Sequence, residues 1–209
     1  MARLIFYTNP LSRGRIVRWM LEEVGASYET VVLDYETSMH GAQYLAVNPM
    51  GKVPAIAHDG RVVTECAAIC AYLADAFPEA GLAPTGEERA DYYRWLFFFA
   101  GPGEQAMTNH YAGFDPDPGQ TRMFGYGSFD RTVNALEQGV SAHPFIAGDR
   151  FTAADVYVGA SLGWATQFGM LPKRDAFLSY VARVQDRDAF RRANALDDAL
   201  APMPGAVPA

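Results

Sequence analysis

The sequence of 209 residues predicts an α/β domain followed by an all-helical domain. The first 33 residues alternate a strand, a helix and a strand, and residues 54–76 have the pattern of two strands, joined by a tight turn, and a helix. Beyond residue 88 apolar residues recur only at helical spacing. Hydrophobic residues make up 50% of the chain and charged residues 20%, which is enough apolar material for a sizeable core.

The opening segment is a predicted β-α-β unit. Residues 3–7 form a short strand, residues 12–24 a helix with its apolar side chains on one face, and residues 28–33 a second strand. Gly25 is expected to end the helix, because glycine suits the left-handed position after a helix. The two strands of such a unit lie parallel in one sheet.

A strand, turn, strand and helix follow, after a short helix expected near residues 42–47. Pro54 belongs at the first position of a strand, because it cannot donate a sheet hydrogen bond. Asp59 and Gly60 form a hairpin turn signal. Thr64 is expected to cap a helix with Glu65 in its first turn and apolar side chains at positions 69, 72, 73 and 76.

The second half begins with a linker at residues 78–87, which is rich in proline and glycine. Long helices are predicted at residues 88–112, with a break at Gly101-Pro102-Gly103, and at residues 120–140. Thr152 and Asp155 have the spacing of a capping box that starts another helix. The last helices are expected near residues 175–185 and 188–199, and the proline-rich tail at residues 201–209 is not expected to continue them.

Composition excludes several classes of function. The chain has 17 basic and 24 acidic residues, which argues against nucleic acid or an anionic membrane surface as the main partner. The four-residue apolar run near the N-terminus is too short for a signal peptide or a membrane span, so a cytoplasmic protein is expected. Cys66 and Cys70 fit neither a redox pair nor a metal set, and we expect two small buried side chains and no metal.

A family resemblance rests on residues 47–73. The run N-P-x-G-K-V-P-A-I at residues 48–56, followed by Glu65 and the helix A-A-I-x-x-Y-L, resembles the glutathione-binding half of cytosolic, bacterial glutathione S-transferases. The order β-α-β-α-β-β-α resembles the thioredoxin fold. The resemblance implies a thioredoxin-like glutathione-binding domain at residues 1–77 and an all-helical domain at residues 88–209. It also places the capping box at the start of a central buried helix, about residues 153–168.

The resemblance implies how glutathione binds, as a co-substrate. A cis bond before Pro54 leaves the N–H and C=O of Val53 open, so that the tripeptide adds as an extra strand. Glu65 and the backbone N–H of Cys66 are expected to hold the γ-glutamyl end. The family usually has serine where Cys66 stands, and a thiol is a weaker donor. Lys52 and His40 are the candidates for binding the glycine carboxylate. Arg13 is a further candidate for contact with the ligand.

The chemistry requires a lowered pKa of the bound thiol, because the thiolate is the nucleophile. The loop at residues 7–13 offers a hydroxyl, the start of a helix, and the cations Arg13 and Arg15. The first candidate donor to the thiolate is Ser12, by similarity to serine-type members; Asn9 is the second and Tyr7 the third. Asn9 and Ser12 stand where a glutaredoxin-like protein has two cysteines, so an internal dithiol cycle is impossible.

The implied function is a homodimeric transferase that adds glutathione to small hydrophobic electrophiles. The electrophile pocket is expected between the domains, and its candidate residues on the helical side are Met107, Tyr111, Phe114, Trp164 and Phe168. A glutathione-dependent peroxidase or isomerase using the same ligand site is one alternative. A non-catalytic binding protein that retains the fold is the other.

Overall fold

The computed structural model describes residues 3–201, which divide into two compact units. One unit comprises residues 3–80 together with residues 187–201, and the other comprises residues 81–186. All but the first residue of the proline-rich tail lies outside the described residues.

The first unit is built on a mixed four-stranded sheet of order β2-β1-β3-β4. The strands are β1 (Leu4–Thr8), β2 (Glu29–Val32), β3 (Ala55–His58) and β4 (Arg61–Thr64). As predicted, β1 and β2 are parallel, whereas β3 is antiparallel to both β1 and β4. The φ angles of Asp59 and Gly60, 49° and 79°, are those of a two-residue hairpin turn.

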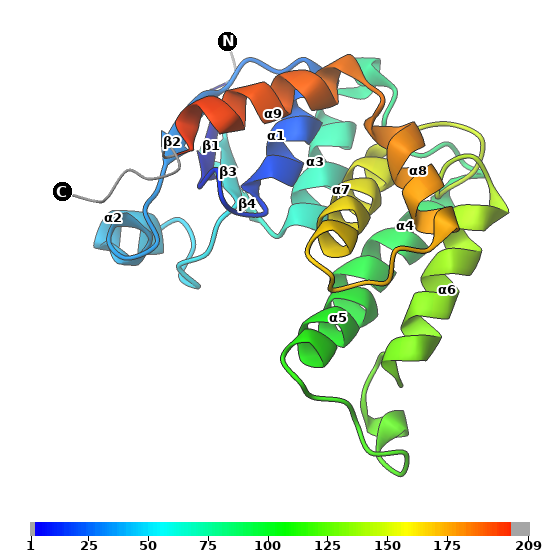
Figure 1. The fold of residues 1–209 in the computed structure, drawn as a ribbon. Helices are drawn as coiled ribbons and strands as arrows, with labels where there is room; N and C mark the ends of the chain where they lie inside the picture. The colour runs from blue at the N-terminus through cyan, green and yellow to red at the C-terminus, as the bar shows by residue number, and fades with distance from the viewer. Residues whose placement is uncertain (1–2, 202–209) are drawn as a thin grey trace. The chain divides into compact units, whose positions relative to one another are not determined.

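Helices α1 (Gly14–Val24) and α3 (Cys66–Ala76) pack against each other, and both contact the sheet (Figure 1). Gly25 ends α1 in the left-handed conformation, as expected. Between β2 and β3 lie the 3-10 turn η1 (Ser38–His40) and the short helix α2 (Ala42–Leu45), and the 3-10 turn η2 (Pro78–Ala80) follows α3. This order confirms the thioredoxin-like fold.

Two expectations in this unit need correction. Thr64 is the last residue of β4 rather than a helix cap, because the strand pairing with Ala55 continues to it. The N-cap of α3 is Glu65. The last helix, α9 (Asp188–Leu200), was expected to complete the helical domain, but it packs along α1 within the first unit (Figure 1).

The second unit is helical throughout. Its elements are α4 (Arg89–Phe98), the π-helical turn η3 (Phe99–Gly103), α5 (Glu104–Tyr111), the 3-10 turn η4 (Thr121–Met123), α6 (Phe129–Ala142), α7 (Ala153–Gln167) and α8 (Asp175–Gln185). The predicted break at Gly101-Pro102-Gly103 is the π-helical turn, which accommodates Pro102 between α4 and α5. Helix α7 is the central buried helix, and the capping box of Thr152 and Asp155 is present.

The helix predicted at residues 120–140 was wrong at its start. Helix α6 begins only at Phe129, where the Ser128 hydroxyl caps it by accepting a hydrogen bond from the Arg131 N–H. Residues 112–128 form a connection with one 3-10 turn instead. The apolar helical spacing starts at Phe129, and the preceding stretch lacks it.

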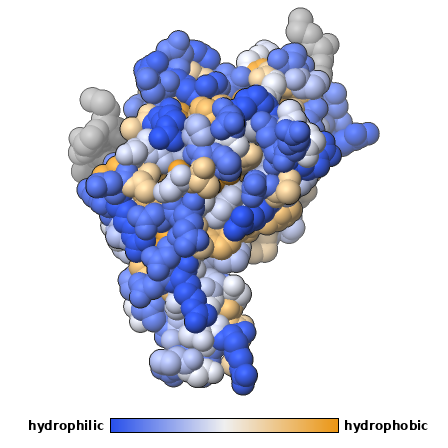
Figure 2. All heavy atoms as spheres, turned by 90° about the vertical axis from the view of Figure 1, so that its right-hand side faces the viewer, coloured by the Kyte–Doolittle hydropathy of each residue, from blue (hydrophilic) through white to orange (hydrophobic). Residues whose placement is uncertain are grey.

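The surface is mostly hydrophilic with scattered apolar side chains on the face that Figure 2 presents. None of the helices within residues 3–201 has the length and apolar run needed to cross a bilayer.

Candidate functional site

The loop between β1 and α1 is fixed by the side chain of Asn9. Its Nδ2 donates to the Leu33 carbonyl at 2.8 Å, and its Oδ1 accepts from the Leu11 N–H at 2.9 Å. Asn9 therefore ties the loop to the residue that follows β2.

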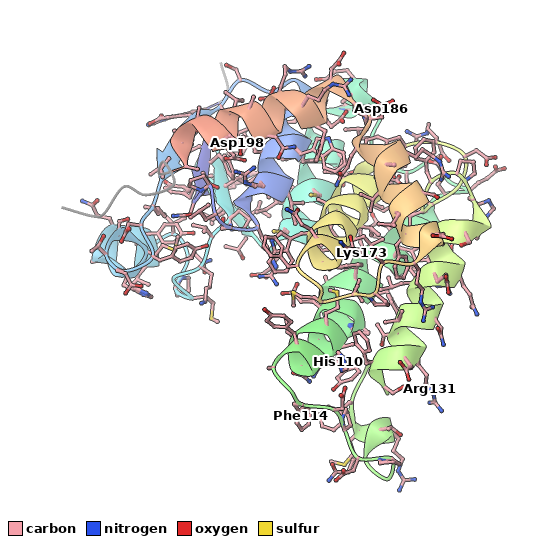
Figure 3. All side chains as sticks on the ribbon, in the orientation of Figure 1. His110, Phe114, Arg131, Lys173, Asp186 and Asp198 are labelled. Atoms are coloured by element: carbon pink, nitrogen blue, oxygen red, sulfur yellow. The ribbon has the colours of Figure 1, made fainter. Side chains whose placement is uncertain are left out.

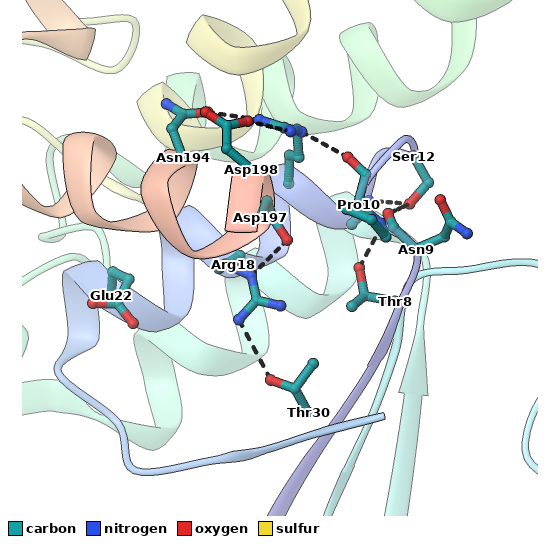
Figure 4. Close-up of polar contacts among 12 residues, drawn as sticks. Thr8, Asn9, Pro10, Ser12, Arg18, Glu22, Thr30, Asn194, Asp197 and Asp198 are labelled. Carbon is teal, nitrogen blue, oxygen red and sulfur yellow. Dashed lines mark hydrogen bonds and ion pairs between the residues drawn. The ribbon is translucent and has the colours of Figure 1, made fainter. Parts of the chain in front are cut away.

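The Ser12 hydroxyl lies in the same loop and has two backbone partners. It donates to the Asn9 carbonyl at 2.6 Å and accepts from the Gly14 N–H at 2.9 Å (Figure 4). The oxygen thus binds the first N–H of α1, and its proton points at Asn9. Donation to a ligand sulfur requires this proton to leave the Asn9 carbonyl.

The start of α1 lies very close to the end of β1. A Cβ atom at Gly14 would lie 1.9 Å from the Thr8 Oγ1 and 3.0 Å from the Ser12 Oγ. Only glycine allows this approach, because it has no side chain. The close contact sets where the helix N-terminus lies relative to Ser12.

Tyr7 points to the face of the sheet opposite to that of Phe6 and Thr8, because side chains alternate along a strand. Its ring centroid is 5.5 Å from that of Tyr44, and it packs on an apolar cluster that contains Leu33, Tyr44 and Ala55. Tyr7 is thus part of the wall behind the cis-proline turn. The turn itself is held because the Tyr44 hydroxyl donates to the Lys52 carbonyl at 2.5 Å. Burial raises the pKa of Tyr44 to about 12.

The peptide bond between Val53 and Pro54 is cis, as expected. Within residues 3–201, no group forms a hydrogen bond with the N–H or C=O of Val53. Val53 is nevertheless half-buried and packs on the apolar cluster beside Tyr7. Its main chain is therefore a preformed edge with an open donor and an open acceptor.

The N-terminus of α3 is next to the Ser12 loop. The Cys66 thiol, which is buried, donates to the Arg13 carbonyl at 3.6 Å, so the two segments are in contact. Glu65 is exposed and has a φ of 67°, which is unusual for a residue with a side chain. Such strained residues cluster at functional sites.

Lys52, His40 and Arg13 are exposed. His40 lies against the turn that contains Lys52, because a Cβ atom at Gly51 would lie 3.3 Å from the His40 Nδ1. The structure therefore brings His40 and Lys52 to one turn, and it brings Arg13 to the start of α3.

The candidates on the helical unit divide into two groups. Met107 is buried in the core, whereas four aromatic side chains are exposed: Tyr111, Phe114, Trp164 and Phe168. The rings of Trp164 and Phe168 lie 5.2 Å apart, and Phe114 packs on Phe124 at 5.6 Å. Figure 3 places Phe114 beyond the end of α5.

Sequence reasoning missed two arrangements. Next to Phe114, the His110 Nδ1 lies 2.9 Å from an Asp115 carboxylate oxygen, and the imidazole stacks on Phe129 at 3.8 Å (Figure 3). Arg15 was noted only as a nearby cation, but its Nε donates to the Pro10 carbonyl at 2.7 Å. The sequence carries no local signal for this contact with the carbonyl group of Pro10.

A thioredoxin-like sheet with a cis-proline turn, followed by a helical unit, defines the class of the protein. The model of the glutathione S-transferase N-terminal domain matches residues 13–76, and that of the C-terminal domain matches residues 79–195. The chain belongs to the glutathione S-transferase family and is an enzyme of that family.

Similar proteins and solved structures also belong to the glutathione S-transferases. The glutathione S-transferase GST-4.5 of Xanthomonas campestris is 30% identical over 91% of this chain and 98% of its own. The glutathione S-transferase GstA of Escherichia coli is 32% identical over 69% of this chain and 74% of its own. The crystal structure of a glutathione transferase from Methylococcus capsulatus has a TM-score of 0.76 and 31% identity, covering 94% of this chain and 99% of that one. A sphingomonad glutathione S-transferase complexed with glutathione has a TM-score of 0.74 and 27% identity, covering 93% and 98%.

Proposed function

We propose that the protein conjugates the thiolate of reduced glutathione to small hydrophobic electrophiles. The observation that carries this proposal is the open main chain of Val53 before the cis bond to Pro54. An extended peptide adds to such an edge through its own N–H and C=O groups. The similar sphingomonad enzyme, complexed with glutathione, supports glutathione as that peptide.

The charged groups around this edge suit the two ends of glutathione. The N-terminus of α3, with the Cys66 N–H, binds the γ-glutamyl carboxylate, because a helix N-terminus favours an anion. The Glu65 carboxylate faces the ammonium group of the same end. Lys52 and His40 face the glycine carboxylate, and Arg13 contacts the ligand near the thiol.

Ser12 donates a hydrogen bond to the sulfur in this proposal. A hydrogen bond to a charged acceptor contributes about 1.5–3 kcal/mol, and a helix N-terminus about 0.3–1 kcal/mol. Together they lower the thiol pKa by roughly 1–3 units from about 8.5. The thiolate then attacks the electrophilic carbon and forms a C–S bond. A leaving group departs with its bonding electrons, or the adduct takes a proton from water.

The electrophile is bound by hydrophobic side chains of the helical unit. The exposed rings of Trp164 and Phe168, together with Tyr111 and Phe114, offer apolar surface to such a substrate. Met107 is buried on α5, the helix that also carries Tyr111. Aromatic side chains contribute large contact areas to binding sites.

Calorimetry with glutathione and a conjugation assay with a chloronitroaromatic substrate test the proposal. We expect binding at millimolar glutathione or below, and a Ser12→Ala variant that loses turnover while it keeps its affinity for glutathione. Full turnover in Ser12→Ala with a loss in Asn9→Ala would move the donor role to Asn9. Activity only with an organic hydroperoxide or a cis-enone acid would replace conjugation by a peroxidase or isomerase reaction. No binding of glutathione would leave a non-catalytic binding protein.

Assembly and location are part of the same proposal. A homodimer is supported by the exposed apolar pair of Tyr93 and Phe97 on α4, whose rings lie 6.3 Å apart. Sedimentation of wild type and Phe97→Glu tests this, and a wild-type monomer would exclude it.

Cys66 and Cys70 form no disulfide and are buried, which supports a reducing, cytoplasmic location. Fractionation of the producing cells tests the location.

A further inference from the structure

Helices α1 and α9 are joined by a row of charged pairs. Arg15, Arg18 and Glu22 lie three and four residues apart on α1 and share the face that is turned to α9. Glu23 pairs with Arg187, the residue directly before α9. The pairs and their shortest distances are Arg15 with Asp198 at 2.6 Å, Arg18 with Asp197 at 2.7 Å, Glu22 with Arg192 at 3.1 Å, and Glu23 with Arg187 at 2.6 Å.

The Arg15 pair differs from the others because it continues into the loop that carries Ser12. The Arg15 guanidinium donates from Nη2 to Asp198 at 2.6 Å, from Nη1 to Asn194 at 3.2 Å, and from Nε to the Pro10 carbonyl at 2.7 Å (Figure 4). All three nitrogen atoms of one planar group are engaged. The guanidinium is rigid, so its orientation on α9 fixes the direction of its bond to Pro10.

Pro10 lies in the turn between Asn9 and Ser12, and hydrogen bonds across this turn determine the position of the Ser12 hydroxyl. The Asn9 carbonyl accepts one hydrogen bond from the Ser12 hydroxyl at 2.6 Å and another from the Ser12 N–H at 3.1 Å. The peptide group between Pro10 and Leu11 lies inside this turn, so its orientation is part of the geometry of the turn. Within residues 3–201, two side chains hold this peptide group: the Nε of Arg15 donates to the Pro10 carbonyl, and the Oδ1 of Asn9 accepts from the Leu11 N–H.

We propose that Asn194 and Asp198 of α9 are positioning residues that act through Arg15 to hold the Ser12 loop in its reactive geometry. This proposal rests on the proposed function, because it assigns the loop the task of stabilising the glutathione thiolate. A C-terminal helix, far from the loop in sequence, thereby becomes part of the reaction geometry without touching the ligand. Small displacements of reacting groups are costly: about 1 Å of misplacement can cost about 10²-fold in rate.

The test compares two changes at the same helix interface. The double variant Asn194→Ala/Asp198→Ala frees Arg15 from α9. The control Arg192→Gln removes the pair with Glu22, which joins the same two helices and has no contact with the loop. For each protein we would measure kcat, KM for glutathione, unfolding by urea, and the pH titration of thiolate absorbance with bound glutathione.

We expect the double variant to lower kcat by roughly 10-fold to 100-fold, with KM for glutathione changed less than about threefold. The thiol of bound glutathione should titrate at a higher pH. Arg192→Gln should keep the wild-type kcat and the wild-type titration of the bound glutathione thiol, even if its stability to urea is lower. Arg15→Lys should behave like the double variant, because lysine keeps the charge but loses the planar fork.

Amide hydrogen exchange at Leu11 and Ser12 separates this proposal from the proposed function. It reports the order of the loop without any ligand, and we expect faster exchange in the double variant but not in Arg192→Gln. A protein that binds no glutathione, yet shows this difference in exchange, would overturn only the proposed function. Unchanged exchange, kcat and thiol titration in the double variant would overturn the positioning role, as would equal losses in Arg192→Gln.

Discussion

The Tyr180 hydroxyl on α8 donates a hydrogen bond of 2.8 Å to the buried carboxylate of Asp155 on α7. The same carboxylate accepts from the Ile146 N–H at 2.7 Å and from the Thr152 N–H at 2.9 Å. Asp155 thus completes the capping box of α7 and also joins this helix to α8 and to the segment before it. Burial, and then the neighbouring Asp155, raise the pKa of Tyr180 well above its usual value.

Replacement of Tyr180 by Phe should lower the free energy of unfolding by about 1.5–3 kcal/mol, the range for hydrogen bonds to charged groups. The ring still fills its site, so the loss reports the hydroxyl alone. Urea unfolding of Tyr180→Phe measures it. Tyr35→Phe is the control, because Tyr35 is exposed and its hydroxyl has a longer bond of 3.3 Å to the Leu11 carbonyl. Equal stability of the two variants would contradict the prediction.

Local signals predicted most of this fold, and contacts distant in sequence explain the rest. The hairpin at Asp59, the cap at Gly25 and the box at Thr152 each depend on residues close in sequence, and all three were predicted. The packing of α9 against α1 was not predicted, because it depends on pairs such as Arg18 with Asp197, which are 179 residues apart in sequence. No periodicity within α9 specifies its partner helix.

The same distinction applies to the candidate site. The cis bond before Pro54 was expected from the motif around it, and the contact of the Cys66 thiol with the Arg13 carbonyl was not. This contact joins the loop before α1 to the first residue of α3, and the two residues are 53 positions apart in sequence. Motifs predicted which residues matter, whereas the bond of Arg15 to the Pro10 carbonyl required the fold.

Substitution of Gly14 by Ala should destabilise the first unit by about 1–3 kcal/mol, the usual cost of overpacking. The new Cβ would lie 1.9 Å from the Thr8 Oγ1, so β1 and α1 must separate. Thermal or urea unfolding measures the loss. Gly86→Ala is the control, because nothing lies within 4 Å of its Cβ position. The pair Gly14→Ala/Thr8→Ala should recover part of the stability, and no recovery would argue against the clash as the cause.

Cys70 should resist alkylation in the native protein at pH 8. Burial, together with the neighbouring Cys66, raises the pKa of the Cys70 thiol well above its usual value, so the reactive thiolate is scarce at this pH. Mass spectrometry after treatment with a maleimide measures the extent of modification at each cysteine. The unfolded protein in urea should be modified at both positions. Rapid modification of native Cys70 would show that this part of α3 opens readily.

The ion pair of Glu88 and Arg150 should contribute less stability in acid. Burial opposes ionisation of Glu88, but hydrogen bonds from Arg150 and Thr85 outweigh it and hold the pKa of this carboxyl below its usual value. A carboxyl with a lowered pKa in the folded state stabilises it above the unfolded pKa, about 4.3, and loses this effect as the pH falls through the folded pKa. Glu88→Gln should therefore be less stable than wild type at pH 7, by about 0.2–1 kcal/mol. Urea titrations at pH 7 and pH 3 should show the difference shrinking, and a constant difference would rule out the charge as its source.

The turn before Val53 should depend on two hydrogen bonds that share one acceptor. The Lys52 carbonyl accepts from the Tyr44 hydroxyl at 2.5 Å and from the Asn48 Nδ2 at 2.8 Å. Either donor alone still satisfies this carbonyl, so Tyr44→Phe and Asn48→Ala should each weaken glutathione binding only slightly. Together they leave the carbonyl without either side-chain donor, and we expect the double variant to lose more than the sum of the single losses, with a coupling of about 0.5–3 kcal/mol. Calorimetric titration of the four proteins with glutathione completes this cycle. Strictly additive losses would mean that the two donors hold the turn independently, and that the position of Val53 does not depend on their shared acceptor.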